Sequence, residues 1–288
     1  MTLADLSGTW TLRDAEGAYS CDFTLPGDGI TALHDAGLIP DPYWGRNEYD
    51  LRWICERDWT VRRSFELDDT DVVLVLSEVD TVATVTVNGT DVARLENAFR
   101  SYRIPLSGVA RTGSNEIAIT FHSPVEAGRK KQEAHPFEIP WSKNCPIPYG
   151  NFLRKPACDF GWDWNIALAP FGVYGDLRIE KAGADRIARL EISQRHEGGT
   201  VMLDLAAHLE GAATEAEFLI AGQTVAVPVI AGTARTTITI ADPKLWWPAG
   251  QGDQPLYDLT VRAGTETAHR QIGLRKMELV TEPDDAGL

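Results

Sequence analysis

Short segments in which apolar and polar residues alternate with a period of two dominate this sequence of 288 residues. Such alternation places every second side chain on one face of an extended strand, so it predicts strands with one buried face. Turn-forming residues separate the segments, and helical periodicity is scarce. The clearest local signal is Asn88-Gly89, which lies between the apolar pair Val85 and Val87 and the following Val92. Because Asn-Gly suits the two-residue turn of a hairpin, this stretch predicts a β-hairpin, and the whole pattern predicts an all-β fold.

The predicted strands fall into two sets. We interpret the first set as a jelly-roll β-sandwich over residues 1–182, with strands at Trp59–Leu67, Val72–Leu76, Ala83–Leu95, Tyr102–Pro105, Glu116–His122 and Gly175–Lys181. Small and polar residues at 181–185 then indicate a domain boundary. The second set has the spacing of an immunoglobulin-like β-sandwich, which we place at residues 183–288. Its strands are predicted at Ile187–Arg195, Thr200–Leu209, Glu215–Ile220, Gln223–Val229, Thr233–Ile240, Leu256–Arg262 and His269–Val280.

The charge of the chain excludes one class of partner. Its 27 basic and 42 acidic side chains give a net charge of −15, whereas nucleic-acid binding depends on clustered Lys and Arg. The first residues have neither the basic nor the apolar region of a secretory signal, and no run is long and apolar enough to span a membrane. We therefore expect a soluble, cytoplasmic protein with no nucleic-acid or membrane partner.

Cysteine and histidine spacing gives no support for a metal site. The four cysteines show no Cys-x-x-Cys spacing, and the six histidines never occur at a metal-ligand spacing. We expect buried free thiols, with a Cys145–Cys158 disulfide as the less favoured alternative.

Two segments of the first domain lack strand periodicity. Residues 123–158 hold six prolines and several aromatic residues, and we interpret them as a long loop of the functional kind, since disordered segments are poor in aromatics. The basic run Arg129-Lys130-Lys131 inside it is typical of a solvated patch. Asp41–Glu48 is rich in groups that suit a pocket, but we interpret it as a structural turn in which Trp44 covers the sandwich core.

The end of that loop leads into Gly161-Trp162-Asp163-Trp164, where one carboxylate lies between two indoles. A carboxylate accepts hydrogen bonds from neighbouring sugar hydroxyls, and an indole face packs against the apolar side of a pyranose ring. The same pattern is also typical of a buried tryptophan pair whose Asp satisfies backbone N–H groups. Residue types alone leave both interpretations open.

Catalytic residues are not evident. Glycoside hydrolysis ordinarily needs two carboxyl groups across the scissile bond on a rigid scaffold. No pair of acids lies at the ends of strands that alternate with helices, as a (β/α)₈ barrel requires. Asp159 and Asp163 are four residues apart, but a Trp-rich stretch is more typical of substrate positioning than of acid/base chemistry. We assign no catalytic residue to this chain.

Several motifs together resemble the N-terminal half of glycoside hydrolase family 2 enzymes, and among them the β-mannosidases. The motifs shared widely in that family are Val87-Asn88-Gly89, Asn97 with Phe99 and Tyr102, Gly113-Ser114-Asn115, Leu245-Trp246-Trp247-Pro248 and Ile272-Gly273-Leu274-Arg275. Those that resemble β-mannosidases are Leu25-Pro26-Gly27, Ile39-Pro40-Asp41-Pro42-Tyr43, Asp58-Trp59, Arg154-Lys155 and Phe160-Gly161-Trp162-Asp163-Trp164. The resemblance covers nearly the whole chain.

The resemblance implies a jelly-roll, galactose-binding-like domain, an immunoglobulin-like domain and then a catalytic (β/α)₈ barrel that these residues do not include. Both catalytic glutamates of the family lie in that barrel, so this chain alone is expected to be inactive. By the same resemblance, Trp162 and Asp163 contact the terminal mannose of a β-mannoside, and Trp164 is left as a core residue. No cofactor and no metal are implied.

The predicted activity is therefore removal of terminal non-reducing β-D-mannose with retention of configuration, and the implied partners are the mannoside substrate and the barrel of the same polypeptide. Two alternatives stay open. One is another exo-glycosidase of family 2, such as an exo-β-glucosaminidase, and the other is a stand-alone carbohydrate-binding or scaffold protein.

Overall fold

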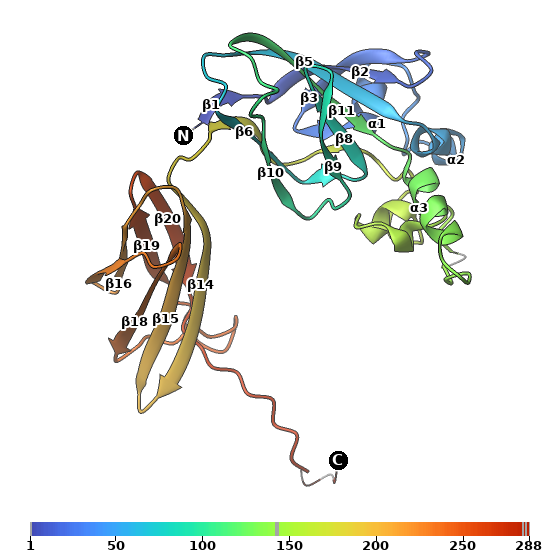
Figure 1. Ribbon diagram of the computed structural model, residues 1–288. Coiled ribbons are helices and arrows are strands. Elements are labelled where there is room, and N and C mark those ends of the chain that lie inside the picture. Colours follow the sequence, from blue (N-terminus) through green and yellow to red (C-terminus); the bar gives the residue numbers. More distant parts are fainter. Residues whose placement is uncertain (1, 142–143, 284, 286, 288) are drawn as a thin grey trace. The chain divides into compact units, whose positions relative to one another are not determined.

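The chain forms two compact units, Met1–Ala182 and Gly183–Leu288, in a computed structural model that describes residues 2–141, 144–283, 285 and 287 (Figure 1). Each unit is built from antiparallel strands. The strands of the first unit are β1 (Thr2–Asp5), β2 (Gly8–Asp14), β3 (Ser20–Leu25), β4 (Gly27–Asp28), β5 (Trp59–Leu67), β6 (Val72–Ser77), β7 (Val79–Asp80), β8 (Ala83–Val87), β9 (Thr90–Leu95), β10 (Ser101–Pro105), β11 (Gly113–Phe121), β12 (Gly172–Val173) and β13 (Leu177–Lys181). Its helical segments are α1 (Gly29–Asp35), α2 (Asn47–Leu51), η1 (Arg52–Glu56), α3 (Pro124–Glu133), η2 (Gly150–Phe152) and η3 (Ala157–Phe160).

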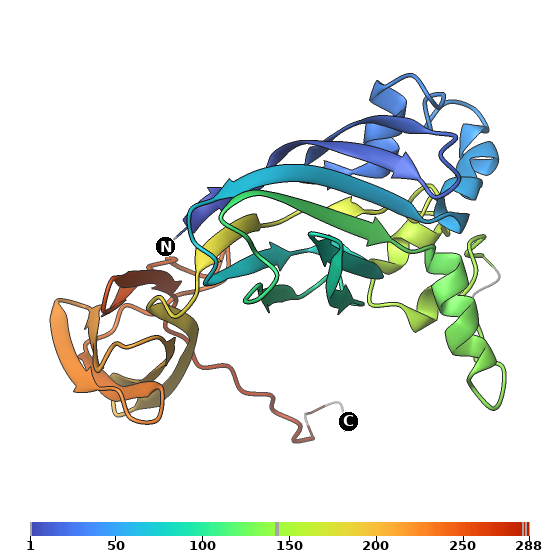
Figure 2. The ribbon, with the colours of Figure 1, turned by 45° about the horizontal axis from the view of Figure 1, so that its top comes forward.

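Two larger sheets form the sandwich of the first unit. One has the strand order β3-β2-β5-β11-β8-β9, and the other has the order β1-β13-β6-β10. Figure 2 shows the long strands of the first of these sheets side by side, from blue through cyan to green. A small third sheet, β4-β12-β7, joins segments that are far apart in the sequence. This third sheet lies next to the loop that carries the Trp-Asp-Trp sequence, because Pro170 and Phe171 lead directly into β12.

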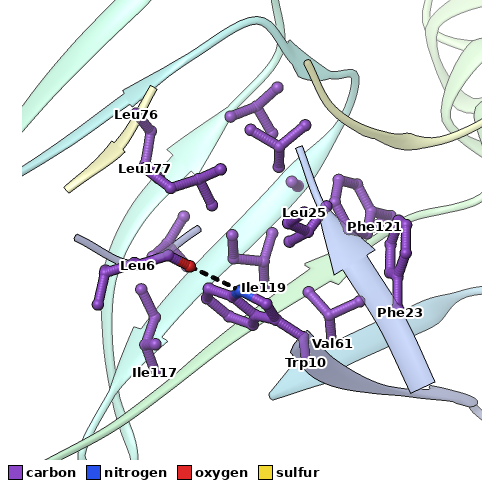
Figure 3. Packing of buried hydrophobic residues seen from close by; sticks show 14 of the residues in the cluster. Leu6, Trp10, Phe23, Leu25, Val61, Leu76, Ile117, Ile119, Phe121 and Leu177 are labelled. Carbon is purple, nitrogen blue, oxygen red and sulfur yellow. Dashed lines mark hydrogen bonds between the residues drawn. The ribbon is translucent and has the colours of Figure 1, made fainter. Parts of the chain in front are cut away.

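The core of the first unit holds the apolar residues that the alternation points inward. Trp10, Phe23, Val61 and Ile119 are all fully buried and pack together (Figure 3). The indole N–H of Trp10 is satisfied there, because its Nε1 donates to the carbonyl of Leu6 at 2.9 Å. Burial of a side chain of this size stabilises the fold by about 1.5–3 kcal/mol.

The predicted hairpin is confirmed between β8 and β9. Asn88 and Gly89 both have positive φ values, 50° and 80°, as the two central residues of a type I′ turn require. The Asn88 side chain also accepts a hydrogen bond from the Glu116 backbone N–H at 3.0 Å and donates to Asn115 Oδ1 at 2.8 Å. The turn is therefore fixed by its own geometry and by two contacts to β11.

The prediction that residues 123–158 form a continuous loop is wrong in its first third, which is the helix α3. The side chain of Ser123 accepts a hydrogen bond from the Glu126 N–H, and Pro124 occupies the first turn. Both are recognised helix-start signals. Within the helix Arg129 pairs with Glu126 and Glu133. The basic run therefore lies on a helix, where Arg129 neutralises neighbouring acids.

The second unit contains two further sheets, with the orders β14-β15-β18 and β17-β16-β19-β20. Their strands are β14 (Arg186–Glu197), β15 (Thr200–Glu210), β16 (Glu215–Ile220), β17 (Gln223–Pro228), β18 (Thr233–Ala241), β19 (Tyr257–Ala263) and β20 (Glu266–Ile272). A separate core that includes Phe218, Leu203 and Val261 lies in this unit.

The last strand ends earlier than predicted. β20 stops at Ile272, and residues 273–280 are not part of a strand. Met277, Leu279 and Val280 are 84%, 90% and 73% exposed. The apolar residues of this segment matched a strand pattern, but a strand needs a neighbour to receive its hydrogen bonds, and the described part of the chain supplies none here.

Candidate functional site

The Trp-Asp-Trp segment follows a short 3-10 helix that is anchored in a small core of its own. η3 ends at Phe160, which is fully buried and packs edge-on against Trp141, with ring centroids 6.0 Å apart. Gly150 lies against the Phe160 ring so closely that a Cβ there would be 2.7 Å from it. The chain therefore enters the segment from a fixed point.

Gly161 turns the chain outward after Phe160. Its φ is +94°, and a Cβ at this position would lie 2.8 Å from both Ala167 Cβ and Pro146 Cδ. Trp162 also has a positive φ, 114°, which is uncommon for a residue with a side chain. An unusual backbone conformation held by surrounding structure is a recognised indicator of a functional loop.

The two indoles stack on each other at the surface. The rings of Trp162 and Trp164 have centroids 5.2 Å apart and planes inclined by 13°. Their exposed fractions are 43% and 60%, so the prediction that Trp164 is a core residue is wrong. Each ring covers one face of the other, so both indoles are partly buried although neither lies in the protein interior.

Asp163 lies between the two tryptophans in the sequence, and its side chain is exposed. Among the residues that the structure describes, Asp163 has no hydrogen-bond or ion-pair partner. The alternative in which this Asp satisfies backbone N–H groups therefore does not describe the segment. An exposed carboxylate next to aromatic residues in the sequence is free to accept hydrogen bonds from a ligand.

A buried lysine lies beneath the segment, and sequence reasoning did not identify it as functional. The Lys155 side chain is 1% exposed, and its ammonium contacts the carboxylate of Asp80 and, at 2.9 Å, that of Asp159. It also donates to the Pro170 carbonyl at 2.6 Å. A buried lysine needs acidic partners, and Asp159 was visible four residues away. Asp80 is 75 residues away, and only the fold brings it close.

The acid of this cluster has a perturbed ionisation. Burial raises the pKa of Asp80 to about 6, and the charge of nearby Asp159 adds to that effect, while Lys155 opposes it.

The turn Asp41–Glu48 is a second neighbour of the segment. Glu48 accepts a hydrogen bond from the Ala167 N–H at 3.2 Å, which connects the turn to the returning part of the loop. Tyr43 and Trp44 are 73% and 75% exposed, so the prediction that Trp44 covers the core is wrong. The backbone N–H of Trp44 donates to the Asp41 carbonyl at 3.2 Å, which closes a turn. The Trp44 ring points outward from this turn.

A cavity of about 180 Å³ opens beside the loop. Its lining combines phenol rings, an amide and apolar side chains, and includes Tyr43, Tyr174, Asn165, Pro42, Ile166 and Pro170. Small-molecule sites commonly combine aromatic walls with a few polar groups in this way.

A second polar cluster lies at the start of α3. Asp58 bonds with one carboxylate oxygen to His122 Nδ1 and accepts the Ser123 N–H with the other, each at 2.8 Å. His122 Nε2 lies 2.8 Å from the Thr84 hydroxyl. The hydrogen bond with His122 lowers the pKa of Asp58. Because these contacts direct the chain into the helix, we assign the cluster a structural role.

The cysteines are all free. Cys145 and Cys55 are buried, whereas Cys158 is exposed and Cys21 is half-buried. The expectation that all four are buried is therefore wrong for Cys158 and holds only in part for Cys21, and the alternative disulfide between Cys145 and Cys158 does not form. Burial raises the pKa of Cys55 to about 12. Among the described residues, no group of His, Cys, Asp and Glu is arranged to hold a metal ion. Nor does the described part of the chain include a helix of the length and apolarity that crossing a bilayer requires.

Two family models match the chain in succession. The model of the glycosyl hydrolase 2 galactose-binding domain-like family matches residues 10–175, and that of the glycosyl hydrolases family 2 matches residues 177–275. Similar curated proteins include a probable β-mannosidase of Caenorhabditis elegans, 28% identical over 98% of this chain and 34% of the relative. Another is β-mannosidase B of Thermothelomyces thermophilus, 31% identical over 87% of this chain and 31% of the relative. The chain thus spans about a third of the length of these relatives.

Solved structures support the fold. A β-D-mannosidase from Dictyoglomus thermophilum aligns with a TM-score of 0.88 at 24% identity, over 99% of this chain and 38% of that one. The exo-chitosanase of Amycolatopsis orientalis aligns with a TM-score of 0.63 at 18% identity, over 99% of this chain and 35% of that one. The predicted all-β fold class, a galactose-binding-like jelly roll followed by an immunoglobulin-like sandwich, is confirmed.

Proposed function

Starting from the fact that this chain belongs to family 2 of the glycosyl hydrolases, we propose that it forms the non-catalytic part of a β-mannosidase. The whole protein removes terminal non-reducing β-D-mannose residues with retention of configuration. The observation that carries the proposal is the exposed carboxylate of Asp163, which has no partner among the described residues and is flanked in the sequence by two surface indoles. The names of the curated relatives reported above supply the choice of mannose.

In this proposal residues 1–182 form the sugar-binding-like jelly roll, and residues 183–288 form an immunoglobulin-like domain that leads toward a catalytic barrel. The barrel lies outside these 288 residues and supplies both catalytic carboxyl groups. In a retaining enzyme these groups are about 5–5.5 Å apart, one as nucleophile and one as acid/base. No residue of this chain takes either role. The setting we propose is cytoplasmic.

The contribution of this chain is to bind and orient the sugar. The Asp163 carboxylate accepts hydrogen bonds from neighbouring hydroxyls of the terminal mannose, and the Trp162 indole shapes the wall of the same subsite. Holding a substrate in reactive geometry removes part of the entropic barrier of the reaction. Loss of Asp163 should therefore lower kcat/KM in the whole enzyme.

The test uses the polypeptide expressed from its whole reading frame. We expect it to hydrolyse nitrophenyl β-D-mannoside in preference to the corresponding glucosaminide, galactoside and glucuronide. Asp163→Ala should reduce kcat/KM by about 10²-fold or more, an effect typical of a lost positioning contact. The matched control is Asp68→Ala, because Asp68 is also an exposed aspartate of the first unit. Equal kinetics for the two variants would contradict the role of Asp163.

An exo-β-glucosaminidase is the second candidate, because the exo-chitosanase structure shares the fold of the whole chain. Preferential cleavage of the β-D-glucosaminide in the same panel would select it. If the native reading frame ends at Leu288, a carbohydrate-binding or scaffold protein replaces both enzyme proposals.

A further inference from the structure

Lys155 has no remaining capacity for other partners. An ammonium group offers three N–H donors, and here they face Asp80, Asp159 and the Pro170 carbonyl. The side chain is 1% exposed, and the side chains of its two acidic partners are 2% and 14% exposed. A buried charge of this kind persists only where its hydrogen bonds are complete.

The three acceptors belong to parts of the chain that frame the Trp-Asp-Trp segment. Asp159 lies just before the segment, in η3, and Pro170 lies at the end of the returning loop. The two ends are also joined directly, because the Ala169 N–H donates to the Asp159 carbonyl at 2.9 Å. One ammonium therefore closes the base of the loop formed by residues 160–169.

Asp80 connects that base to the sandwich. It ends β7, where it is opposite Gly172 of β12 in the small three-stranded sheet. Within this sheet Gly172 lies so close to β4 that a Cβ at Gly172 would be 2.2 Å from the Gly27 carbonyl oxygen. The close packing of this sheet therefore holds Asp80, the acceptor on the sandwich side, in place.

We propose that Lys155 is a positioning residue of the sugar site, which holds the loop 160–169 in the conformation that stacks the two indoles and exposes Asp163. This inference rests on the proposed function for its effect on catalysis, but its effect on the loop is independent of any substrate. Lys155 does not touch the sugar. It acts through Asp159 and Pro170 on the residues between them.

General stabilisation alone does not account for the arrangement. Replacement of a buried ion pair by apolar side chains is often neutral or stabilising, so such a pair is weak evidence for stability. What an apolar side chain does not reproduce is the simultaneous attraction of three acceptors on three chain segments. In addition to its part in stability, Lys155 therefore determines the geometry of the loop 160–169.

The first experiment reads the loop itself in the 288-residue chain. Two indoles stacked at 5.2 Å give a coupled near-ultraviolet circular dichroism signal, which is isolated as the difference between the parent and Trp164→Phe. In Lys155→Met we expect this signal to fall to the level of Trp164→Phe. An unchanged signal in a folded Lys155→Met chain would overturn the proposal.

Two further variants distinguish a specific effect on the loop from a general loss of stability. Asn115→Ala breaks a buried polar network that bonds to Arg111 and Gly113 and does not touch the loop. It should lower the melting temperature and keep the tryptophan signal. If Lys155→Met does not fold, Asp159→Asn keeps the side-chain size and removes one charge of the base, and it should weaken the signal. Retention of the full signal in Asp159→Asn would contradict the role of this contact.

The second experiment measures catalysis in the whole polypeptide. Lys155→Met should lower kcat/KM for a β-mannoside by about 10²-fold, as expected for a displaced positioning group, whereas Asn115→Ala should keep it. If Asp163→Ala also keeps full activity while Lys155→Met loses the tryptophan signal, the proposed sugar contact fails and the positioning of the loop stands. If Asp163→Ala is impaired and Lys155→Met keeps both activity and signal, the positioning role fails and the proposed function stands.

Discussion

Replacement of Lys155 by Met should destabilise the first unit strongly at alkaline pH. The substitution leaves the Asp80 carboxylate, which is 2% exposed, without its cation. Removing one partner of a buried ion pair costs about 3–5 kcal/mol, because the other charge stays buried and uncompensated. We expect a loss in the free energy of unfolding of that size at about pH 8.

The loss in the free energy of unfolding should be smaller in acid, because it depends on the ionisation of Asp80. Burial raises the pKa of Asp80 to about 6 in the parent, so ionisation of this group opposes folding as the pH rises toward that value. Lys155 lowers the same pKa, and its removal must therefore raise it further. Below about pH 5 both proteins hold Asp80 protonated, and the deficit of the variant is smallest. Above about pH 6 the deficit grows by about 1.4 kcal/mol per pH unit until Asp80 ionises in the variant.

The assay is urea unfolding followed by tryptophan fluorescence at several pH values, since most of the nine tryptophans belong to the first unit. Lys181→Met is the control, because its ammonium forms a pair with Asp69 at 2.5 Å whose side chains are 49% and 36% exposed. An exposed pair is worth about 0–1 kcal/mol. A Lys155→Met chain that matches this control, or whose deficit grows on acidification, would refute the argument.

Three further results are expected from the chain alone. Gly89→Ala should lower the melting temperature through a cost of about 1 kcal/mol, because its φ of 80° lies in the region that glycine favours; an unchanged melting temperature would contradict the turn assignment. Ser123→Ala removes the N-cap of α3 and should cost about 0.5–2 kcal/mol in urea unfolding, and a stability equal to the parent would show that the cap is dispensable. In a native thiol titration Cys158 should react first, whereas Cys55, which is buried and has its pKa raised to about 12, should react only after unfolding; rapid labelling of Cys55 would contradict its burial.

Most of the strand positions were predictable because the signal is local. The segment Trp59–Leu67 shows its inward and outward faces directly in the alternation, and it is β5 with the same limits. The Asn88-Gly89 pair likewise encodes its own turn, since the required backbone conformation is a property of these two residues.

The helix α3 was also encoded locally, yet the prolines and aromatic residues around it concealed it. Ser123-Pro124 followed by Glu126 contains the cap, the preferred proline position and an acid in the first turn. These signals lie in only a few residues, whereas the period-two pattern repeats along the whole chain. A reading led by periodicity therefore missed them.

The candidate site was predicted only in part from the sequence. The sequence identified Trp162 and Asp163 as residues suited to a sugar, but it left open whether the tryptophans were buried. Exposure is decided by what packs around a segment, and here Gly161 turns the chain outward while Phe160 fills the small core behind it. The stack of Trp162 on Trp164 is a consequence of that turn.

The sequence by itself determined the all-β class, the positions of most strands and the residue types at the surface loop, because alternation, turn residues and motif order are properties of neighbours along the chain. Only the tertiary structure decided that Lys155 is buried, that Asp80 approaches it from 75 residues away, and that Asp163 has no partner among the described residues. These are contacts between distant segments, and their energies depend on burial and on the number of hydrogen bonds each charge completes. Neither quantity is contained in the local pattern.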